Sequence, residues 1–314
     1  MLTHMAQARS CIELLKELVI DQNQPKGERL VFSGVSDRDV YNIAAPFLDN
    51  GELVIAGRVE ARHKEASEVI FFVNRKGEWV PRNNAPIFAL QDPFFSFING
   101  ELVFGGVEVY FDSEDSDYVT SWRTVFFRGN SINELESFAQ GPLTMKDIRL
   151  VELASGNIGV FTRPMVVDGA RALIGYVEIN NLSELTEEKI LAAELFRNQF
   201  LLDEWGGVNE ARLLSNGKIG VLGHIAYMEE SNIRHYYPMV YCFDPELRNN
   251  SPIKLIASRA MFQEGPAKRT DLQDVLFSGG IVRHSNGTAS LYTGVSDSEA
   301  HVIVIADPFL EYEK

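Results

Sequence analysis

The chain has 314 residues, of which 45% are apolar and 23% are charged, a composition that excludes disordered, collagen-like and coiled-coil proteins. It carries 44 Asp and Glu residues against 29 Lys and Arg, and the net charge of −15 argues against nucleic acid or an anionic membrane surface as a partner. No apolar run in the sequence approaches the roughly 20 residues that span a bilayer.

Residues 5–20 are predicted to form an amphipathic helix, because charged residues such as Glu13 and Glu17 interrupt the apolar positions. Those charges do not fit the apolar stretch of a secretory signal. The two cysteines, Cys11 and Cys242, are far apart and indicate neither a disulfide framework nor a zinc motif. We therefore expect a soluble cytoplasmic protein.

One pattern occurs five times along the chain: an apolar strand, a polar turn that ends in glycine, and a second apolar strand. The turn glycines are Gly51, Gly100, Gly156, Gly217 and Gly287. Asn precedes the glycine in four copies, and Asn-Gly between apolar strands predicts a β-hairpin whose two turn residues both have positive φ. The glycines are 49, 56, 61 and 70 residues apart, spacings that fit one four-stranded sheet per repeat, as in a propeller blade.

A further β-rich segment follows each hairpin, at residues 68–73, 122–127, 172–177, 238–243 and 301–306. Five hairpins with five following strands predict an all-β fold, a five-bladed β-propeller. The alternative, a two-sheet sandwich, would not need five equivalent hairpins at these spacings.

Other segments complete the predicted architecture. Residues 185–200 are predicted to be a helical insertion, with Thr186 as N-cap. Near-duplicate phrases occur at Ser33-Gly-Val-Ser-Asp37 and Thr293-Gly-Val-Ser-Asp297, and the first is a candidate for the strand that closes the ring. We expect an N-terminal helix and lead-in over residues 1–29 and a single propeller domain over residues 30–314.

Polar residues at or just before the first strand of each repeat should converge on one funnel at the centre of a propeller. They include Asn42, Asp92, Lys146, Glu210 and Asp274. Carboxylates mixed with aromatic residues suit a sugar, whose hydroxyl groups donate to carboxylates and whose apolar face stacks on rings.

Asp92 is the first candidate for a general acid. It precedes Pro93, Phe94 and Phe95, and desolvation by these neighbours would raise its pKa and keep it protonated. The alternative is that Asp92-Pro93 only opens a strand through an Asx-turn.

Five cations, at Arg58, Arg123, Arg128, Lys146 and Arg163, are candidates for an anion site, because arginine pairs in bidentate fashion with phosphate or carboxylate. The alternative is that they neutralise acidic neighbours in ion pairs. His224, near the end of the fourth hairpin, is expected to face inward, in a catalytic or a structural role. The six histidines lack the spacing of metal ligands, so no metal is predicted.

A series of short motifs occurs in order: Asn42 before Arg58-Val-Glu60, then Gln91-Asp92-Pro93, Lys146-Asp147 with Thr162-Arg163-Pro164, Gly223-His224, and finally 274–280 with 292–297. This series resembles glycoside hydrolase family 130, the β-mannoside phosphorylases and mannosidases, whose fold is a five-bladed propeller. As a whole, over roughly residues 30–308, the chain looks most like the domain of unknown function 1861 family, near the β-fructosidase and arabinanase superfamily.

The resemblance implies roles for individual residues. Asp92 matches the general acid of family 130, which passes its proton through a sugar hydroxyl to the glycosidic oxygen while phosphate or water attacks with inversion. Lys146 and His224 match part of the phosphate site, and Arg123 and Arg128 match its arginines more loosely. Asn42, Arg58 and Asp297 match residues that hold the mannosyl unit. The family's Glu-Asp-Pro-Arg is here Gln91-Asp92-Pro93-Phe94, so one carboxylate and one arginine are missing.

These observations favour an inverting glycoside hydrolase or glycoside phosphorylase acting on a small β-linked oligosaccharide, with a mannose-containing sugar as the family's example. No cofactor is predicted, and inorganic phosphate would be the co-substrate of a phosphorylase. The alternatives are a carbohydrate-binding propeller without activity and, by analogy of fold alone, a protein scaffold. The oligomeric state stays open.

Overall fold

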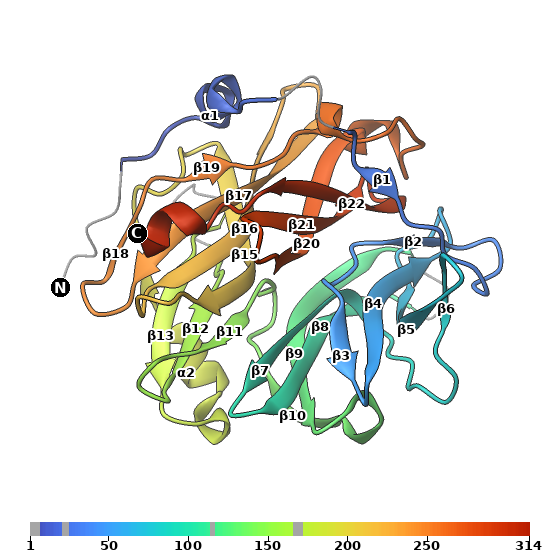
Figure 1. Ribbon diagram of the computed structural model, residues 1–314, viewed down its shortest axis with the longest axis horizontal. Helices are drawn as coiled ribbons and strands as arrows, with labels where there is room; N and C mark the ends of the chain where they lie inside the picture. Colours follow the sequence, from blue (N-terminus) through green and yellow to red (C-terminus); the bar gives the residue numbers. More distant parts are fainter. Residues whose placement is uncertain (1–6, 21–24, 114–116, 166–171) are drawn as a thin grey trace.

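The computed structural model describes residues 7–20, 25–113, 117–165 and 172–314, and it is built mostly of β-strands (Figure 1). The prediction of a mostly β chain is confirmed. The strands of the described residues form five antiparallel meanders that follow one another along the chain and lie around a common centre (Figure 1).

The first two meanders are separate sheets. The first contains β2 (Asp39–Tyr41), β3 (Phe47–Asp49), β4 (Glu52–Glu60), β5 (Ser67–Arg75) and β6 (Glu78–Pro81). The second contains β7 (Gln91–Ile98), β8 (Glu101–Phe111), β9 (Val119–Gly129) and β10 (Glu136–Gln140). In both meanders, the hairpin predicted from the sequence is present, as β3 and β4 in the first and as β7 and β8 in the second. The β-rich segment predicted after each hairpin forms β5 and β9, respectively.

The remaining three meanders follow the same order. The third contains β11 (Arg149–Glu152), β12 (Ile158–Thr162), β13 (Gly175–Ile179) and β14 (Glu194–Leu195). The fourth contains β15 (Glu204–Leu213), β16 (Ile219–Met228), β17 (Arg234–Asp244), β18 (Asn249–Asn250) and β19 (Lys254–Leu255). The fifth contains β20 (Asp274–Arg283), β21 (Thr288–Val295), β22 (Glu299–Ala306) and β1 (Glu28–Arg29). A short parallel pairing of β17 with β20 joins the last two meanders into one hydrogen-bonded sheet.

The two ends of the chain meet in the fifth meander, because β1 pairs antiparallel with β22. Residues 33–37, the predicted closing strand, form a bend and a turn instead, and Glu28–Arg29 take that place. Close contact between the first and fifth meanders also depends on glycine. A Cβ added at Gly279 would lie 1.6 Å from the carbonyl oxygen of Ile43, so a larger residue would force β20 away from the segment between β2 and β3.

All five turn glycines have positive φ, as predicted. The partner residue has positive φ only at Asn50 and Asn99, so the prediction for the turn as a whole is correct in the first two hairpins alone. In the fourth, Gly217 donates to Leu214, whose N–H donates to Lys218, the pattern of a three-residue loop that ends in a left-handed glycine. The third and fifth hairpins have the same pattern.

Apolar clusters lie between successive meanders. One joins Phe71 of the first meander to Phe104 of the second, and another joins Phe161 of the third to Tyr241 of the fourth. Similar clusters join the second to the third, the fourth to the fifth and the fifth to the first. Since truncating a buried phenylalanine costs about 3–5 kcal/mol, these interfaces hold the centre of the molecule in place.

The two predicted helices are shorter than expected. Helix α1 covers Cys11–Glu17, begins at a capping box formed by Ser10 and Glu13, and ends at Leu18; residues 5 and 6 lie outside the described residues. In the 185–200 segment, α2 covers only Glu187–Leu191, because the following residues leave the helix to form β14 against β13.

The described part of the chain also forms five short 3₁₀ turns, at Ile132–Glu134, Leu182–Glu184, Arg259–Met261, Thr270–Leu272 and Leu310–Glu313. Among the described residues, neither α1 nor α2 has the length and apolar character required to cross a membrane.

Candidate functional site

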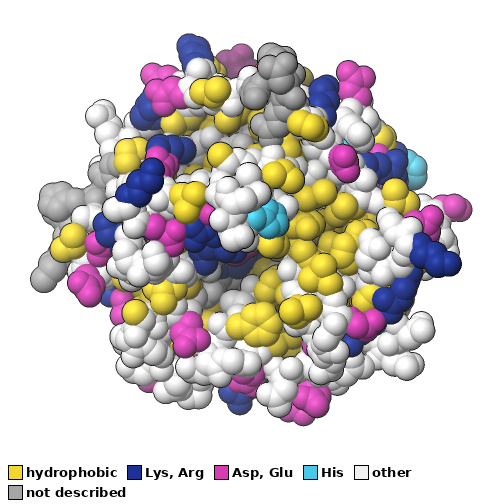
Figure 2. All heavy atoms as spheres, viewed as in Figure 1, with side chains coloured by type: hydrophobic (Ala, Val, Ile, Leu, Met, Phe, Trp, Pro, Cys, Tyr) yellow, Lys and Arg dark blue, Asp and Glu magenta, His cyan; other side chains and the backbone are white. Residues whose placement is uncertain are grey.

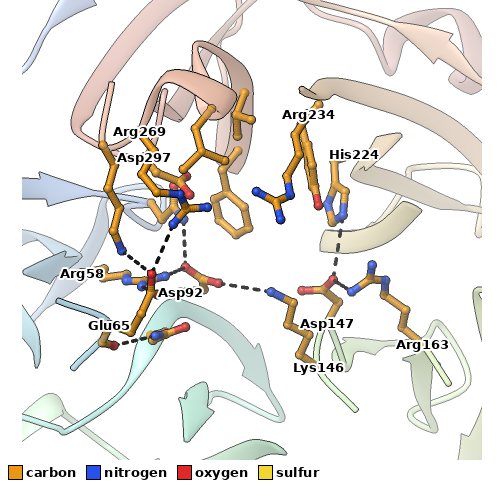
Figure 3. A pocket seen from close by; sticks show the side chains of 17 residues that line it. Arg58, Glu65, Asp92, Lys146, Asp147, Arg163, His224, Arg234, Arg269 and Asp297 are labelled. Carbon is orange, nitrogen blue, oxygen red and sulfur yellow. Dashed lines mark hydrogen bonds and ion pairs between the residues drawn. The ribbon is translucent and has the colours of Figure 1, made fainter. Parts of the chain in front are cut away.

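A pocket of about 230 Å³ lies where the five meanders meet, and it collects seven of the eleven residues proposed from the sequence (Figure 3). These seven are Asn42, Arg58, Asp92, Lys146, Arg163, His224 and Asp297. The face seen in Figure 2 is hollowed near its middle, with lysine and arginine side chains along one edge and apolar side chains along another. The pocket lining has the same mixture, with Val275 and Phe277 among its apolar residues.

Asp92 lies at a bulge at the start of β7 and is only 3% exposed. Its Oδ1 accepts hydrogen bonds from the side-chain amide of Asn42 at 2.9 Å and from Arg58 at 3.2 Å. Its Oδ2 lies 4.0 Å from Nζ of Lys146. One oxygen is therefore held by the protein, and the other lies next to a cation that lines the pocket.

The environment of Asp92 corrects the expectation that it is protonated. Burial raises its pKa, as predicted, but the charges of Arg58 and Lys146 and the hydrogen bond from Asn42 outweigh burial, so its pKa lies below the ordinary value. Asp92 is thus a carboxylate at neutral pH. The sequence indicated the apolar neighbours but not the cations that the fold brings to the same carboxyl group.

A second carboxyl group, that of Asp297, lies on the same side of the pocket (Figure 3). Burial raises its pKa, and the charge of Asp92 raises it further, against the opposing effect of Arg58 and Lys268. Two carboxyl groups in one pocket therefore have pKa values displaced in opposite directions, an arrangement typical of sites that move protons.

Arg58 links these acids to the wall behind them. Its guanidinium lies 2.6 Å from buried Glu60 and over the ring of Tyr41, at 4.9 Å from the centroid. Lys268 also pairs with Glu60 and lies 2.9 Å from Glu65. A buried arginine with two fixed carboxylate partners cannot easily turn away, so it keeps donors directed at Asp92.

On the opposite side of the pocket, Asp147 is 1% exposed and lies 3.0 Å from Arg163 and 4.0 Å from Nε2 of His224. Nδ1 of His224 is 2.9 Å from the side-chain oxygen of Asn209. A Cβ at Gly207 would lie 2.5 Å from Oδ2 of Asp147, so this carboxylate needs a glycine beside it.

Charges on this side are fixed. Burial raises the pKa of Asp147, but Arg163, His224 and Lys146 together lower it to about 2. Burial lowers the pKa of His224 to about 3, so its ring is neutral at physiological pH. A neutral imidazole whose Nδ1 is hydrogen-bonded to Asn209 presents Nε2 towards Asp147 and the pocket.

Cations from both sides reach the space between Asp92 and Asp147. Lys146 has a 39% exposed side chain, and Figure 3 shows it and Arg234 extending into the pocket from opposite walls. Arg234 is paired with Asp271 and is 37% exposed, and Arg269 pairs with the same aspartate. These partly exposed cations can bind an anion that enters the pocket.

Backbone geometry marks the same residues. Asn42, Asp92, Asp147 and Asp297 all have positive φ, between 44° and 61°. Asn and Asp tolerate this region better than most residues, but it is sparsely populated and recurs at functional sites. The strained backbone directs four polar side chains towards one cavity.

Four predicted residues lie outside the pocket lining. Arg123 and Arg128 are on β9, the third strand of their meander, where they contact Tyr110 and Phe138. Glu210 pairs with Arg212 and accepts a hydrogen bond from the backbone N–H of Ile281.

Asp274, the fourth, contacts His235 and Tyr237. Neighbouring residues of a strand point to opposite faces of the sheet, and the place of Asp274 in the repeat alone did not predict which face its side chain occupies.

The pocket also contains residues that were not proposed as site residues. Gln91 and Asp147 occur inside the sequence motifs that were noted, next to chosen residues. Others come from loops and outer strands, where no repeat marks them: Glu65, Arg234, Tyr236, Lys268 and Arg269. Within the described residues, no group of three or more His, Cys, Asp or Glu side chains is arranged to hold a metal ion.

Known structures resemble this one over nearly its whole length. MPT-4, a mannose phosphorylase from Leishmania mexicana in complex with a phosphate ion, is 36% identical, and the match covers 96% of this chain and 93% of that one with a TM-score of 0.85. MPT-1, a GDP-Man-dependent mannosyltransferase from the same organism, is 34% identical, with coverage of 97% and 96% and a TM-score of 0.87.

A more distant match shows the fold alone. The β-1,2-mannobiose phosphorylase from Listeria innocua is 12% identical, with a TM-score of 0.62 and 94% of each chain covered. No curated protein sequence matches the chain. The family model described as protein of unknown function (DUF1861) matches residues 18–311, and the chain therefore belongs to the DUF1861 family.

Proposed function

We propose that the five meanders are the blades of a five-bladed propeller and that the central pocket transfers a mannosyl group between a β-linked mannoside and inorganic phosphate. The observation that carries the proposal is the position of Asp92, a buried carboxylate between Asn42 and Arg58, which can hydrogen-bond a sugar, and Lys146, which can bind an anion. The likeness to a mannose phosphorylase with bound phosphate supports it.

The sugar would lie on the side of Asn42, Arg58 and Asp297. An amide, a guanidinium and a carboxyl group together offer donors and acceptors to neighbouring hydroxyl groups. Phe277 supplies apolar surface on which a sugar ring can stack. Phosphate would lie on the side of Lys146, Arg163 and Arg234.

In phosphorolysis, a phosphate oxygen forms a bond to the anomeric carbon as the bond from that carbon to the glycosidic oxygen breaks. The leaving oxygen needs a proton, which Asp92 supplies directly or through a sugar hydroxyl. In the reverse direction, mannose 1-phosphate is the donor, and ionised Asp92 accepts the proton of the acceptor hydroxyl. The low pKa of Asp92 in the free protein suits the second role.

Phosphate itself would prepare Asp92 for the first role. Lys146 lowers the pKa of Asp92, and an anion beside Lys146 offsets that effect and raises the pKa. Bound phosphate would therefore shift Asp92 towards its protonated form, while Arg58 and Asn42 continue to lower its pKa. Without phosphate, Asp92 stays ionised and cannot protonate the leaving group, which limits wasteful hydrolysis.

GDP-mannose-dependent mannosyl transfer is the second candidate, favoured by the 34% identity to MPT-1. In that reaction ionised Asp92 again accepts the acceptor's proton, and the cations bind the diphosphate of the donor. The difference lies in the leaving group, phosphate or GDP, and one assay separates the two.

The test uses the full-length protein with a panel of β-mannobioses and short β-mannosides, with and without phosphate, and in parallel with GDP-mannose and the same sugars as acceptors. We expect mannose 1-phosphate to form only when phosphate is present. Release of GDP would establish the second candidate, and binding of mannosides without turnover in any arm would establish a binding protein. Free mannose formed equally well without phosphate would contradict the phosphorylase.

A further inference from the structure

A second cluster of titratable side chains lies behind the pocket wall, around His235 on β17. Nδ1 of His235 is 2.7 Å from Oδ2 of Asp274, the first residue of β20. Nε2 is 3.1 Å from Oε1 of Glu229, which immediately follows β16. The ring also stacks on Tyr227 of β16, with centroids 4.5 Å apart and planes 8° from parallel. This one side chain joins the ends of three strands from two meanders.

The geometry shows which form of His235 can donate to both carboxylates. Carboxylate oxygens only accept hydrogen bonds, and a neutral imidazole has a single N–H to donate. Both ring nitrogens of His235 lie within hydrogen-bonding distance of a carboxylate, so both contacts are made only by the imidazolium ion. An imidazolium stacked on Tyr227 also gains from the negative face of that ring.

Other titratable groups around the cluster do not supply a compensating charge. Burial raises the pKa of Tyr227, of Tyr237 and of Cys11 on α1, so all three stay neutral at physiological pH. The hydroxyl group of Tyr237 donates to the same oxygen of Asp274 that faces His235, and it lies 3.3 Å from Nδ1 of His235. Glu204 of β15 accepts from the backbone of Cys11.

His235 lies on the face of β17 that points away from the pocket. Successive residues of a strand point to opposite faces, and Arg234 and Tyr236 on either side of His235 both line the pocket. Tyr236 also accepts a hydrogen bond from Trp205 and stacks on His224 at 5.5 Å. Val275, next to Asp274, lines the pocket as well. The contacts of His235 therefore hold one pocket wall from behind.

We propose that protonated His235 is a positioning residue that holds the wall formed by Arg234 and Tyr236 and thereby makes anion binding in the pocket depend on pH. Loss of the proton leaves Asp274 or Glu229 facing a ring nitrogen that cannot donate. The end of β17 is then held by fewer contacts, and two carboxylates behind the wall lose their counter-charge. Both effects weaken the binding of an anion by Arg234. Only the identity of that anion as phosphate rests on the proposed function.

Calorimetric titration with sulfate tests this inference, because sulfate keeps its double charge between pH 5.5 and 8 while histidine changes charge in that range. In the wild type we expect affinity for sulfate to fall by about fivefold as the pH rises, within the coupling of 5–150-fold typical of linked sites. His235→Phe keeps the stacked ring but removes the donors, and it should bind weakly at every pH. His235→Arg should bind tightly with little pH dependence.

His284→Phe is the matched control, because His284 lies on the hairpin between β20 and β21, bonded to Ser290, and should behave as wild type. Retention of wild-type affinity and pH dependence by His235→Phe would overturn the inference. If that variant does not fold, ¹⁵N NMR of the His235 ring in the wild type tests the inference instead. A ring with a single protonated nitrogen at pH 6 would contradict the inference. Normal sulfate binding without mannosyl turnover would refute the proposed function and leave this inference standing.

Discussion

Asp92 and Asp147 occupy corresponding places in successive meanders, and comparing them explains how one pocket acquires two kinds of acid. Both are buried, and both have positive φ. Asp147 has Arg163 as a close partner, and its pKa falls to about 2. Asp92 shares Arg58 with Glu60, and Asp297 lies nearby.

The two carboxylates differ in how completely groups of the protein itself pair with their oxygens. Asp147 serves to hold a buried arginine and a neutral histidine in place, so it stays ionised under all ordinary conditions. Asp92 has one oxygen held by Asn42 and Arg58 and another oxygen whose cationic neighbour, Lys146, can turn to a ligand. The same backbone position therefore supports a structural anion on one side and a group able to exchange a proton on the other.

Asp92→Asn should have the largest effect on turnover. The amide keeps the shape of the side chain but cannot exchange the proton, so the rate should fall by about 10²–10⁴-fold, the usual contribution of a general acid or base. Mannose 1-phosphate formation measures the rate, and the binding of mannose alone serves as the control for folding. An active Asp92→Asn protein would remove Asp92 from the chemistry.

Asp147→Asn should reduce stability more than it reduces the chemical step. It leaves the buried Arg163 without its carboxylate, and breaking a buried pair in this way costs about 3–5 kcal/mol. Denaturant unfolding measures the loss. If Asp147→Asn were as stable as wild type but inactive, the assignment of the two aspartates would be reversed.

As the pH falls, the folded protein should lose stability first through His224 and only at lower pH through Asp147. The pKa of His224 in the folded protein is about 3, below its ordinary value near 6.5. Between these two pH values only the unfolded chain takes up a proton at this residue. The free energy of unfolding therefore decreases as the pH falls through this interval. The stabilising charge of Asp147 is lost only between about pH 4 and pH 2. His224→Gln should flatten the melting temperature between pH 6.5 and 4. An unchanged slope would show that other groups cause the acid loss.

Lys146→Met should have the smallest of these effects, with its main part on phosphate, although loss of the Lys146 charge also raises the pKa of Asp92. The variant keeps the length of the side chain without the charge, and we expect KM for phosphate to rise by about tenfold, the loss of one charge-assisted hydrogen bond. Arg128→Gln, on β9 beside Phe138, is the matched control and should change KM by less than about twofold. Equal effects of the two substitutions would place the anion outside the pocket.

Sequence patterns were most informative where physics restricts the residue. Positive φ at Gly51 and Gly217 follows from turn geometry, and the repeat of these turns led to the five meanders. Asn42, Asp92 and Lys146 followed from their place before the hairpins and meet in the pocket.

Other features depend on how the chain returns to the centre. Arg234 and Lys268 approach from an outer strand and a loop, where no periodic signal marks them. Asp274 faces His235 because its place in β20 turns its side chain away from the pocket. The pKa of Asp92 likewise depends on cations that only the fold brings near it.

A crystal structure with mannose and phosphate bound together tests the division of the pocket most directly. We expect mannose to lie against Asn42, Arg58 and Asp297, phosphate to lie against Lys146 and Arg234, and Asp92 to lie between the two ligands. Phosphate bound at Arg123 or Arg128, or mannose bound outside the pocket, would contradict this expectation.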